Sequence, residues 1–244
     1  MDAKEFTSAL TRAFSLNGLA GLLNKERTAL FLHLTERMLE ENEKYNLTAI
    51  KDADGIVLKH YVDCATLCAH LPSGARIADV GCGAGFPSLP LAILREDLDI
   101  LAVDSTEKRV EYVRATAELF GLSGLRTRAA RAEDLGRDPA FRERFDVVVS
   151  RAVADLPILA ELCLPLLRVG GKMIAMKGKN AVYEQNAAKR AISILGGKPS
   201  VLIPVPLRNP AGGEEGHALV TVEKQSKTPA TYPRSYAQIS KKPL

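Results

Sequence analysis

Three alternating glycines stand in the segment DVGCGAGFP (79–87), between one short apolar run and the start of another. A strand, a glycine-rich turn and a helix in this order bind nucleotides, because the turn lets a ligand approach the backbone and the helix N-terminus offers free N–H groups. A dinucleotide site needs G-x-G-x-x-G, but Phe86 stands at the position of its third glycine. A P-loop is excluded, because no Gly-Lys pair with Ser or Thr follows. The segment therefore favours a smaller and less anionic ligand than a diphosphate.

Asp104 ends the next apolar run and supports a nucleoside as that ligand. A carboxylate at this point of the layout can accept hydrogen bonds from both ribose hydroxyls. The alternative is that Asp104 and Ser105 cap the following helix, because both residue types are good caps. An adenosyl ligand with a ribose but no pyrophosphate indicates S-adenosylmethionine. We expect Asp79, at the end of the first strand, to meet its ammonium group, and the N–H groups of the loop to meet its carboxylate.

These side chains need a framework of alternating strands and helices, which the sequence predicts after residue 74. Short apolar runs predict strands at 75–80, 99–104, 125–130, 145–151 and 172–178, and helical patterns lie between them at 87–96, 107–121, 156–171 and 181–197. Runs at 200–207 and 217–224 have no helix between them and predict a hairpin. Its first strand should lie at a sheet edge, because Pro204 and Pro206 cannot donate to a ladder. The expected fold class is α/β, Rossmann-like, with a mostly parallel seven-stranded sheet and a C-terminal antiparallel hairpin.

The two ends of the chain differ from this framework. Residues 1–70 are predicted to be helical, with a break around Asn42, Asn46 and Thr48 and a second helix over 56–69. From Lys224 onward the chain carries several bases and no acid, which suits either an anionic partner or a merely solvated tail. We divide the chain into an N-terminal helical extension (1–72), a Rossmann-like domain (73–224) and a basic C-terminal tail (225–244).

The composition is ordinary for a globular protein, with 46% hydrophobic and 25% charged residues and a formal net charge of +4. No apolar run is long enough for a membrane span and no signal segment is recognisable, so we expect a cytoplasmic protein with no membrane partner. The cysteines include no Cys-x-x-Cys pair. His60, Cys64 and Cys68 fall on one helix face, but without a fourth ligand they favour simple packing, and we expect no metal.

Several segments together resemble the ribosomal RNA small-subunit methyltransferase G family, also called GidB. The segments are NEKYNLT (42–48), His60 with Asp63, DVGCGAGFPSLPLAI (79–93), VDSTEKRVEYV (103–113), RAED (131–134), FDVVVSRAVADL (145–156), AMKGK (175–179), YPR (232–234) and KKPL (241–244). The resemblance implies a class I methyltransferase fold that uses S-adenosyl-L-methionine and releases S-adenosyl-L-homocysteine. It implies N7-methylation of a guanine in the 16S ribosomal RNA of the 30S subunit, by a protein that we expect to be a monomer.

The resemblance also implies roles for individual residues. It places Ala132 and Glu133 beside the adenine, Arg151 at the junction of cofactor and substrate, and Lys177 in a basic pocket. The expected catalytic residues are Arg151 and Lys177, and the expected cofactor-binding residues are Asp79, Gly81, Gly83, Gly85, Phe86, Asp104, Ser105, Ala132, Glu133 and Arg151. The chain departs from the family pattern in having Glu41 where a Trp is common and His217 where an Arg commonly opens the last strand. Arg208 could supply the RNA contact of that arginine.

Guanine N7 carries a free lone pair, so its methylation depends on positioning more than on removal of a proton. The sequence agrees, because SRAVADL (150–156) stands where an amine methyltransferase has Asp-Pro-Pro-Tyr or a C5 methyltransferase has its cysteine. For Arg151 we favour contact with a phosphate or the cofactor carboxylate over the guanine O6, the bland alternative being an ion pair with Asp155. The bases expected to follow RNA phosphates are Lys177, Lys179, Arg126, Arg128 and those of the tail.

Two other functions remain open on the sequence alone. One is a small-molecule methyltransferase on the same fold, although the chain has no Trp and no aromatic-rich cap to indicate it. The other is an RNA-binding assembly factor without catalytic activity. Binding of the cofactor and transfer of its methyl group to RNA separate the three.

Overall fold

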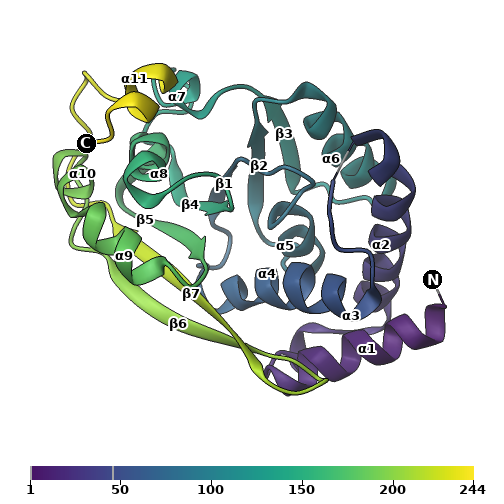
Figure 1. Cartoon of the computed structure of the whole chain (residues 1–244). Helices are drawn as coiled ribbons and strands as arrows, with labels where there is room; N and C mark the ends of the chain where they lie inside the picture. Colours follow the sequence, from purple (N-terminus) through teal and green to yellow (C-terminus); the bar gives the residue numbers. More distant parts are fainter. Residues whose placement is uncertain (1, 46) are drawn as a thin grey trace.

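A twisted seven-stranded sheet forms the centre of the described part of the chain, residues 2–45 and 47–244 of the computed structural model (Figure 1). The strand order is β3-β2-β1-β4-β5-β7-β6, and only β7 runs antiparallel to its neighbours. The order reverses between β1 and β4, and this is the point where ligands bind in open α/β sheets. The expected α/β fold with a C-terminal hairpin is confirmed, and β6 with its two prolines does lie at the edge.

The strands are β1 (Arg76–Val80), β2 (Asp99–Asp104), β3 (Leu125–Ala129), β4 (Phe145–Arg151), β5 (Leu167–Lys177), β6 (Val201–Arg208) and β7 (Glu214–Glu223). The α-helices are α1 (Ala3–Leu16), α2 (Lys25–Tyr45), α3 (Ala53–Ile56), α4 (Asp63–Ala65), α5 (Ser88–Leu94), α6 (Glu107–Leu119), α7 (Ala132–Leu135), α8 (Leu156–Cys163), α9 (Ala181–Ala187), α10 (Lys189–Ile194) and α11 (Tyr236–Lys241). A π-helical segment, η2 (Val57–Val62), joins α3 to α4, and 3₁₀ turns occupy η1 (Ala20–Leu22), η3 (Thr66–His70) and η4 (Leu164–Leu166).

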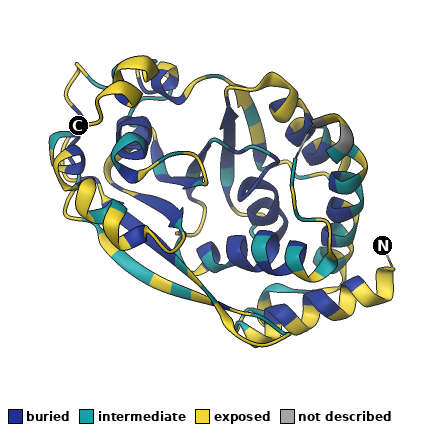
Figure 2. Cartoon of the chain, viewed as in Figure 1, coloured by how far each residue is buried: buried dark blue, intermediate teal, exposed yellow. Residues whose placement is uncertain are grey.

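Side-chain alternation along the strands divides the core into two hydrophobic layers. Ile77 and Ile100 face the layer that contains the N-terminal helices with α5 and α6. Ala78 and Leu101, one residue further along each strand, face the layer with α7, α8 and α10. Burial follows this pattern, since the central strands are buried while β3 and β6 at the edges are largely exposed (Figure 2). The sheet is therefore covered on both faces, as a mostly parallel sheet requires.

Several of the expected elements have different bounds from those predicted. The helix expected over 156–171 ends at Cys163, and β5 begins at Leu167 instead of residue 172. The two glycines that suggested a helix end lie inside β5, where a Cβ on Gly171 would press against the Asp146 carbonyl oxygen of β4. The helix expected over 181–197 is divided at Ala188 into α9 and α10, and β7 begins at Glu214, earlier than predicted. The predicted break around Asn42 falls later, since α2 continues to Tyr45, and Asn46 lies outside the described residues.

The predicted packing face of the second N-terminal helix is confirmed for its two cysteines. Cys64 and Cys68 are buried in the first hydrophobic layer, and burial raises the pKa of both thiols. Residues 2–45 and 47–244 hold no group of three or more His, Cys, Asp or Glu side chains arranged to bind a metal ion. In the same residues no helix is both long and apolar enough to cross a lipid bilayer.

Candidate active site

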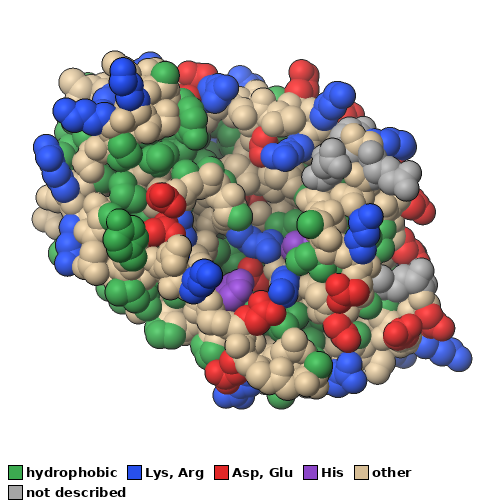
Figure 3. Space-filling view, viewed as in Figure 1, with side chains coloured by type: hydrophobic (Ala, Val, Ile, Leu, Met, Phe, Trp, Pro, Cys, Tyr) green, Lys and Arg blue, Asp and Glu red, His purple; other side chains and the backbone are tan. Residues whose placement is uncertain are grey.

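A cavity of about 510 Å³ opens at the carboxyl ends of β1, β2 and β4, at the point where the strand order reverses. Figure 3 shows the hollow from outside, with basic and histidine side chains at its floor. Its lining is Leu47, His60, Val80, Gly81, Cys82, Gly83, Ala84, Phe86, Val103, Asp104, Ser105, Thr106, Arg109, Ala130, Arg131, Ala132, Glu133, Arg151, Ala152, Val153, Leu162 and Tyr236. We call it the cofactor cavity. It contains eight of the ten predicted cofactor-binding residues, all except Asp79 and Gly85.

The glycine loop is shaped by two close contacts inside the protein. Gly81 has a φ of 77°, and a Cβ there would strike Val153 of the segment that follows β4. Gly85 has a φ of 87°, and a Cβ there would strike Leu89 of α5. Both positions therefore need glycine for the turn and for packing. Gly83 differs, because a Cβ there would meet no atom closer than 4.0 Å, so its backbone borders the open cavity.

Most N–H groups of the loop already have acceptors within the protein. Gly81 and Cys82 donate to the Val103 carbonyl, and Gly85 and Phe86 donate to the Cys82 carbonyl. The Gly83 N–H donates to Asp104 Oδ2 at 3.0 Å. Most hydrogen-bond donors of the loop are thus satisfied within the protein. The expectation that its amides hold a ligand carboxylate has no support in this geometry.

Asp104 joins the loop to the start of α6 from the end of β2. Its Oδ2 accepts from Gly83, and its Oδ1 accepts from the Thr106 N–H at 2.8 Å. The capping interpretation is therefore partly correct, since the carboxylate does hold the turn that leads into α6. A carboxylate has about four acceptor positions, so each oxygen of Asp104 keeps room for a further donor from the cavity. Ser105, the next residue, is also part of the cavity lining.

Asp79 lies beneath the loop and is fully buried. Its Oδ2 accepts from the backbone N–H and the hydroxyl of Ser88, at 3.2 and 2.5 Å. Its Oδ1 is buried and has no hydrogen-bond partner among residues 2–45 and 47–244. Burial raises the pKa of Asp79 to about 7, and the hydrogen bonds from Ser88 oppose that rise. The structure thus gives Asp79 a role beneath α5 and does not bring it to the wall where we expected it to meet an ammonium group.

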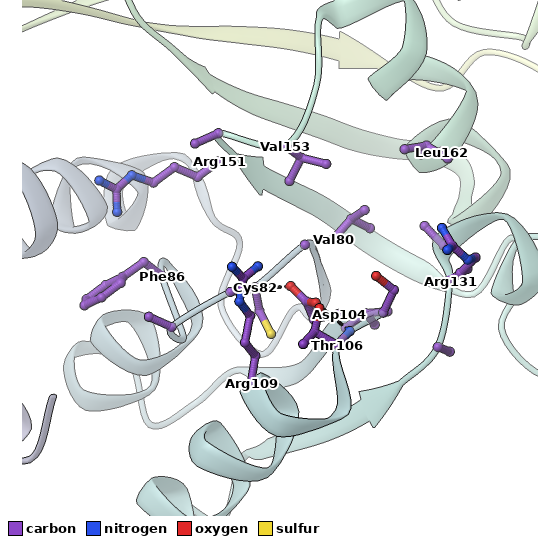
Figure 4. A pocket seen from close by; sticks show the side chains of 18 of the residues that line it. Val80, Cys82, Phe86, Asp104, Thr106, Arg109, Arg131, Arg151, Val153 and Leu162 are labelled. Atoms are coloured by element: carbon purple, nitrogen blue, oxygen red, sulfur yellow. Dashed lines mark hydrogen bonds between the residues drawn. The ribbon is translucent and has the colours of Figure 1, made fainter. Parts of the chain in front are cut away.

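At the other end of the cavity, Phe86 packs against His60 and lies near Arg151, and Figure 4 shows Phe86 and Arg151 at the same end. The His60 ring stacks on Phe86 with centroids 4.6 Å apart, and the Arg151 guanidinium lies 5.8 Å from the Phe86 centroid. His60 Nε2 bonds to the Thr48 hydroxyl at 2.9 Å, and its Nδ1 lies 3.3 Å from Arg151 Nη2. Burial and the nearby Arg151 charge lower the pKa of His60 to about 4. The ring is therefore neutral at pH 7, with both nitrogens already engaged.

A second cavity, of about 460 Å³, adjoins the first across the segment that follows β4. We call it the β4–β5 cavity, and its lining is Asp63, Arg151, Ala152, Val153, Ala154, Asp155, Met176, Lys177, Gly178, Glu184 and His217. Arg151 and Lys177 lie at the carboxyl ends of neighbouring parallel strands, since Arg151 is in register with Met176. Three residues, Arg151, Ala152 and Val153, line both cavities. The two expected catalytic residues thus share the β4–β5 cavity, and only Arg151 reaches the cofactor cavity.

Arg151 is held by the N-terminal helices. Its Nε lies 3.1 Å from Asp63 Oδ2, and its Nη2 donates to the Lys59 carbonyl at 2.7 Å. The alternative in which Arg151 forms a purely structural ion pair with Asp155 is wrong, because Arg151 is paired with Asp63 instead. His217 Nδ1 lies 3.2 Å from the other oxygen of Asp63, and this contact raises the pKa of His217. Asp63, with 4% of its side chain exposed, therefore contacts both Arg151 and His217.

Lys177 is also tied to neighbours. Its Nζ lies 2.6 Å from Glu184 and donates to the Ala154 carbonyl at 2.6 Å. His217 lies in the β4–β5 cavity. The Arg208 side chain instead pairs with Glu214, and the Arg208 backbone N–H and carbonyl bond to the side chain of Asn17, the residue after α1. Of the two candidates for the missing family arginine, only His217 is therefore in the site.

Several lining residues were not among those expected from the sequence. Arg109, in the first turn of α6, points into the cofactor cavity between Phe86 and Asp104 (Figure 4). Its position just after the Asp104 turn is a local signal that could have identified it. Arg131 and Leu162 lie at the opposite end from Phe86 (Figure 4). Tyr236, at the start of α11, comes from the C-terminal segment. Only folding of that segment against the sheet places Tyr236 here, and nothing local in the sequence indicates it.

The basic tail differs from the expectation of a set of free cations. Lys224 is 1% exposed and donates to the Leu164 and Leu167 carbonyls and to Thr228. The prediction that Lys224 contacts RNA is therefore wrong. Burial lowers the pKa of Lys224 to about 8, while nearby Glu143 opposes the shift. Arg234 pairs with Glu161 at 2.7 Å. Lys227, Lys241 and Lys242 are exposed.

Fold and cavity together define a class of protein: the chain has the class I S-adenosylmethionine-dependent methyltransferase fold. A solved structure of the same fold is geranyl diphosphate C-methyltransferase from Streptomyces coelicolor A3(2), in complex with Mg²⁺, geranyl diphosphate and S-adenosyl-L-homocysteine. The TM-score is 0.51 at 16% sequence identity, and the match covers 67% of this chain and 78% of that one. This likeness concerns the fold alone.

Within that class, the chain belongs to the rRNA small subunit methyltransferase G (GidB) family, whose model matches residues 27–205. It is 47% identical over 216 residues to the ribosomal RNA small subunit methyltransferase G of Deinococcus deserti, covering 88% of this chain and 87% of the relative. It is 40% identical over 223 residues to the protein of that name from Clostridium perfringens strain 13, covering 91% and 92%. The resemblance noted in the sequence is thereby confirmed.

Proposed function

We propose that this protein transfers the methyl group of S-adenosyl-L-methionine to N7 of a guanine in 16S ribosomal RNA of the small ribosomal subunit. It would act in the cytoplasm, where the subunit assembles, as a monomer. Family membership supports ribosomal RNA as the substrate. The observation that carries the proposal is the common wall formed by Arg151, Ala152 and Val153, because a donor in one cavity and a base in the other would meet there.

The residues of the cofactor cavity fit an adenosyl ligand. The cavity is hollowed where the backbone of Gly83 leaves open space, and the Asp104 carboxylate beside it retains acceptor positions for ribose hydroxyls. Ala132 and Glu133 also line the cavity, and we assign them to the adenine side. When bound, S-adenosylmethionine supplies an electrophilic methyl group on a sulfonium.

The methionine end of the ligand needs a partner for its carboxylate. Because most of the loop amides are already bonded, the two arginines that line the cavity, Arg109 and Arg151, are the better candidates. Arg151 has two of its nitrogens committed to Lys59 and Asp63, which leaves Nη1 for this role. Arg109 is exposed on the rim, so it can adjust its position to the ligand.

The side chains around the common wall favour a target that needs no deprotonation. Cys82 lines the cavity, but burial raises the pKa of its thiol well above the usual value, so it is not a thiolate nucleophile. His60 has both ring nitrogens engaged and is not a free base. Guanine N7 attacks through its own lone pair, and positioning of well-oriented groups can supply about 7–11 kcal/mol of the barrier. The protein would therefore act by holding the base and the methyl donor in line.

The target guanine must be accessible. N7 lies in the deep groove of A-form RNA, which side chains cannot enter, so the base must be unpaired or turned out of the helix. The β4–β5 cavity contains three cationic and three acidic side chains, Arg151, Lys177, His217, Asp63, Asp155 and Glu184. Such a balanced set suits the mixed donor and acceptor edge of a base. Exposed bases outside the cavity, such as Lys179, would then follow the phosphates.

Transfer of labelled methyl groups tests the proposal. The purified protein is incubated with labelled S-adenosylmethionine and 30S subunits, and the RNA is digested to nucleosides. Label in 7-methylguanosine is the expected result. Label in another nucleoside or in protein overturns the assignment, and turnover of the cofactor without RNA favours a small-molecule substrate. Binding to 30S particles without binding of the cofactor would indicate an assembly factor without catalytic activity.

A further inference from the structure

The C-terminal segment, residues 225–244, folds back over the second hydrophobic layer beside α7 and α8 (Figure 1). Thr228 and Ile239 are buried there. Two guanidinium groups of the body donate to its backbone: Arg142 to the Thr228 and Tyr232 carbonyls, and Arg137 to the Pro233 carbonyl. The segment is therefore fixed by the body along its length and is part of the folded structure.

The start of α11 is fixed more tightly still. Glu161 of α8 is 0% exposed, and it accepts from both the Arg234 guanidinium and the Arg234 backbone N–H, at 2.7 and 2.8 Å. A capping box between Ser235 and Gln238 then begins α11. A buried carboxylate paired in this way limits where Tyr236, two residues after Arg234, can be.

Tyr236 is the first residue of α11 and lines the cofactor cavity. The Arg131 guanidinium lies 5.8 Å from the centre of its ring. Arg131 stands at the far end of the cavity from Phe86 and Arg151, with Asp104 between the two ends (Figure 4). With the ribose at Asp104 and the methyl donor facing Arg151, the end at Arg131 remains for the nucleobase.

We propose that the C-terminal segment builds one wall of the adenine subsite, with Tyr236 as a binding residue that covers the nucleobase of the adenosyl cofactor. This inference rests on the proposed function, because it requires an adenosyl ligand in the cofactor cavity. The Tyr236 ring is 40% exposed, so it has surface left to bury against a planar base. The neighbouring Arg131 guanidinium lies over the ring and helps to hold it at this end of the cavity. The tail thereby contributes to cofactor affinity by packing.

Calorimetric binding of S-adenosylhomocysteine and of adenosine to the full-length protein tests the inference. Tyr236→Ala is expected to weaken both ligands by roughly fivefold, since an aromatic contact is worth about 0.5–1.5 kcal/mol. Tyr236→Phe should retain most of the affinity, because the ring and not the hydroxyl makes the contact. Tyr183→Ala serves as the matched control, since Tyr183 is an exposed tyrosine outside the cavity. Unchanged affinity of Tyr236→Ala for both ligands overturns the inference.

Adenosine locates the effect, because it lacks the methionine end. Weakened binding of S-adenosylhomocysteine with unchanged binding of adenosine would place Tyr236 away from the nucleobase and overturn the inference. Limited proteolysis gives a second readout: the ligand should slow cleavage within residues 225–244 of the wild type, and less so in Tyr236→Ala. Equal cleavage of the wild type with and without ligand also contradicts the proposal. A wild-type protein that binds neither ligand refutes the proposed cofactor itself, which is a distinct result.

Discussion

The two cavities that meet at Arg151 are built in opposite ways. The side of the cofactor cavity at the glycine loop is formed by a turn that bonds to itself and to Val103 and Asp104 of the neighbouring strand β2. The β4–β5 cavity is formed by charges from distant parts of the chain, in which Asp63 of an N-terminal helix pairs with Arg151 of β4 and His217 of β7. Local turns can be identified in a sequence, whereas ion pairs between distant elements depend on the complete fold.

Substitutions in the two cavities should also have different effects, on ligand binding in one and on the stability of the fold in the other. Residues of the cofactor cavity still have open acceptor positions or open space, so changing them should affect mainly the ligand. In the β4–β5 cavity the charges are paired and partly buried, so changing one leaves its partner without a counter-charge. The predictions below test this contrast, from the largest expected effect to the smallest.

Arg151→Ala should reduce both stability and methyl transfer. It leaves Asp63 buried with only His217 as a cationic partner, and loss of one member of a buried pair costs several kcal/mol. Because 19% of the Arg151 side chain is exposed, we expect a loss of about 2 to 3 kcal/mol in the free energy of unfolding. Urea denaturation measures this loss, and methyl transfer to 30S subunits should fall along with it.

A surface ion pair provides the control for Arg151. Arg168→Ala removes a pair with Asp146 in which 52% of the arginine is exposed, so the expected loss is about 1 kcal/mol or less. Equal losses for the two variants would mean that the charges of the β4–β5 cavity are no more important to the fold than a surface pair. The contrast between the two cavities would then be wrong.

Asp104→Ala should act mainly on the cofactor. The carboxylate is expected to hold the ribose, and hydrogen bonds to a charged group are worth about 1.5–3 kcal/mol, so the affinity for S-adenosylhomocysteine should fall by that amount. Asp104→Asn keeps one acceptor oxygen for the loop and should lose less. Calorimetry measures both affinities. An affinity that does not change in Asp104→Ala would reduce Asp104 to a residue that holds the Gly83 and Thr106 turns.

Much of the cofactor side could be predicted from the sequence. The first strand, the glycine loop and Asp104 lie within about 30 residues of one another. Their residue types predict a turn and a hydrogen-bond acceptor without knowledge of the rest of the fold. Gly85 and Asp79 were nevertheless assigned to the ligand, whereas one packs on Leu89 and the other is buried beneath Ser88. Spacing identifies a loop, but it does not show which side of the loop faces the cavity.

The β4–β5 cavity and the tail could not be predicted to the same depth. The sequence suggested Asp155 as the partner of Arg151 because of its local spacing, but the N-terminal helices supply Asp63 instead. A run of bases without acids suggested a free tail, but Glu161 and Glu143, far away in the sequence, pair with two of those bases. The boundaries proposed at residues 72 and 224 remain predictions, since the N-terminal helices share a hydrophobic layer with β1 and β2.

Unlike His60 of the cofactor cavity, His217 gives the β4–β5 cavity a contribution to stability that falls as pH rises. Asp63 raises its pKa above the unfolded value of about 6.5, so this charged contact stabilises the fold fully below that pH. The contribution is lost as pH rises through the raised folded pKa. The unfolding free energy of the wild type should exceed that of His217→Gln by about 1 kcal/mol at pH 6, and the difference should approach zero at alkaline pH.

Denaturation in urea at pH 6 and pH 9 measures that difference. Comparing the two proteins at each pH removes the contribution of His60, whose pKa of about 4 gives the opposite trend, with stability lost as pH falls from about 6.5 towards 4. A difference that grows with pH would contradict a protonated His217 held by Asp63. It would also remove one of the two long-range contacts on which the contrast between the cavities depends.

The smallest expected effect concerns the exposed bases of the C-terminal segment. Removing the whole segment cannot test RNA contact, because Lys224, Thr228 and Ile239 are buried and truncation would damage the fold. Lys227→Gln and the pair Lys241→Gln with Lys242→Gln leave the packing intact. If these side chains meet phosphates, each substitution should reduce the slope of log affinity for 16S RNA against log salt concentration by about 0.7 to 0.9. An unaltered slope would mean that the segment acts only through its packing beside the cofactor cavity.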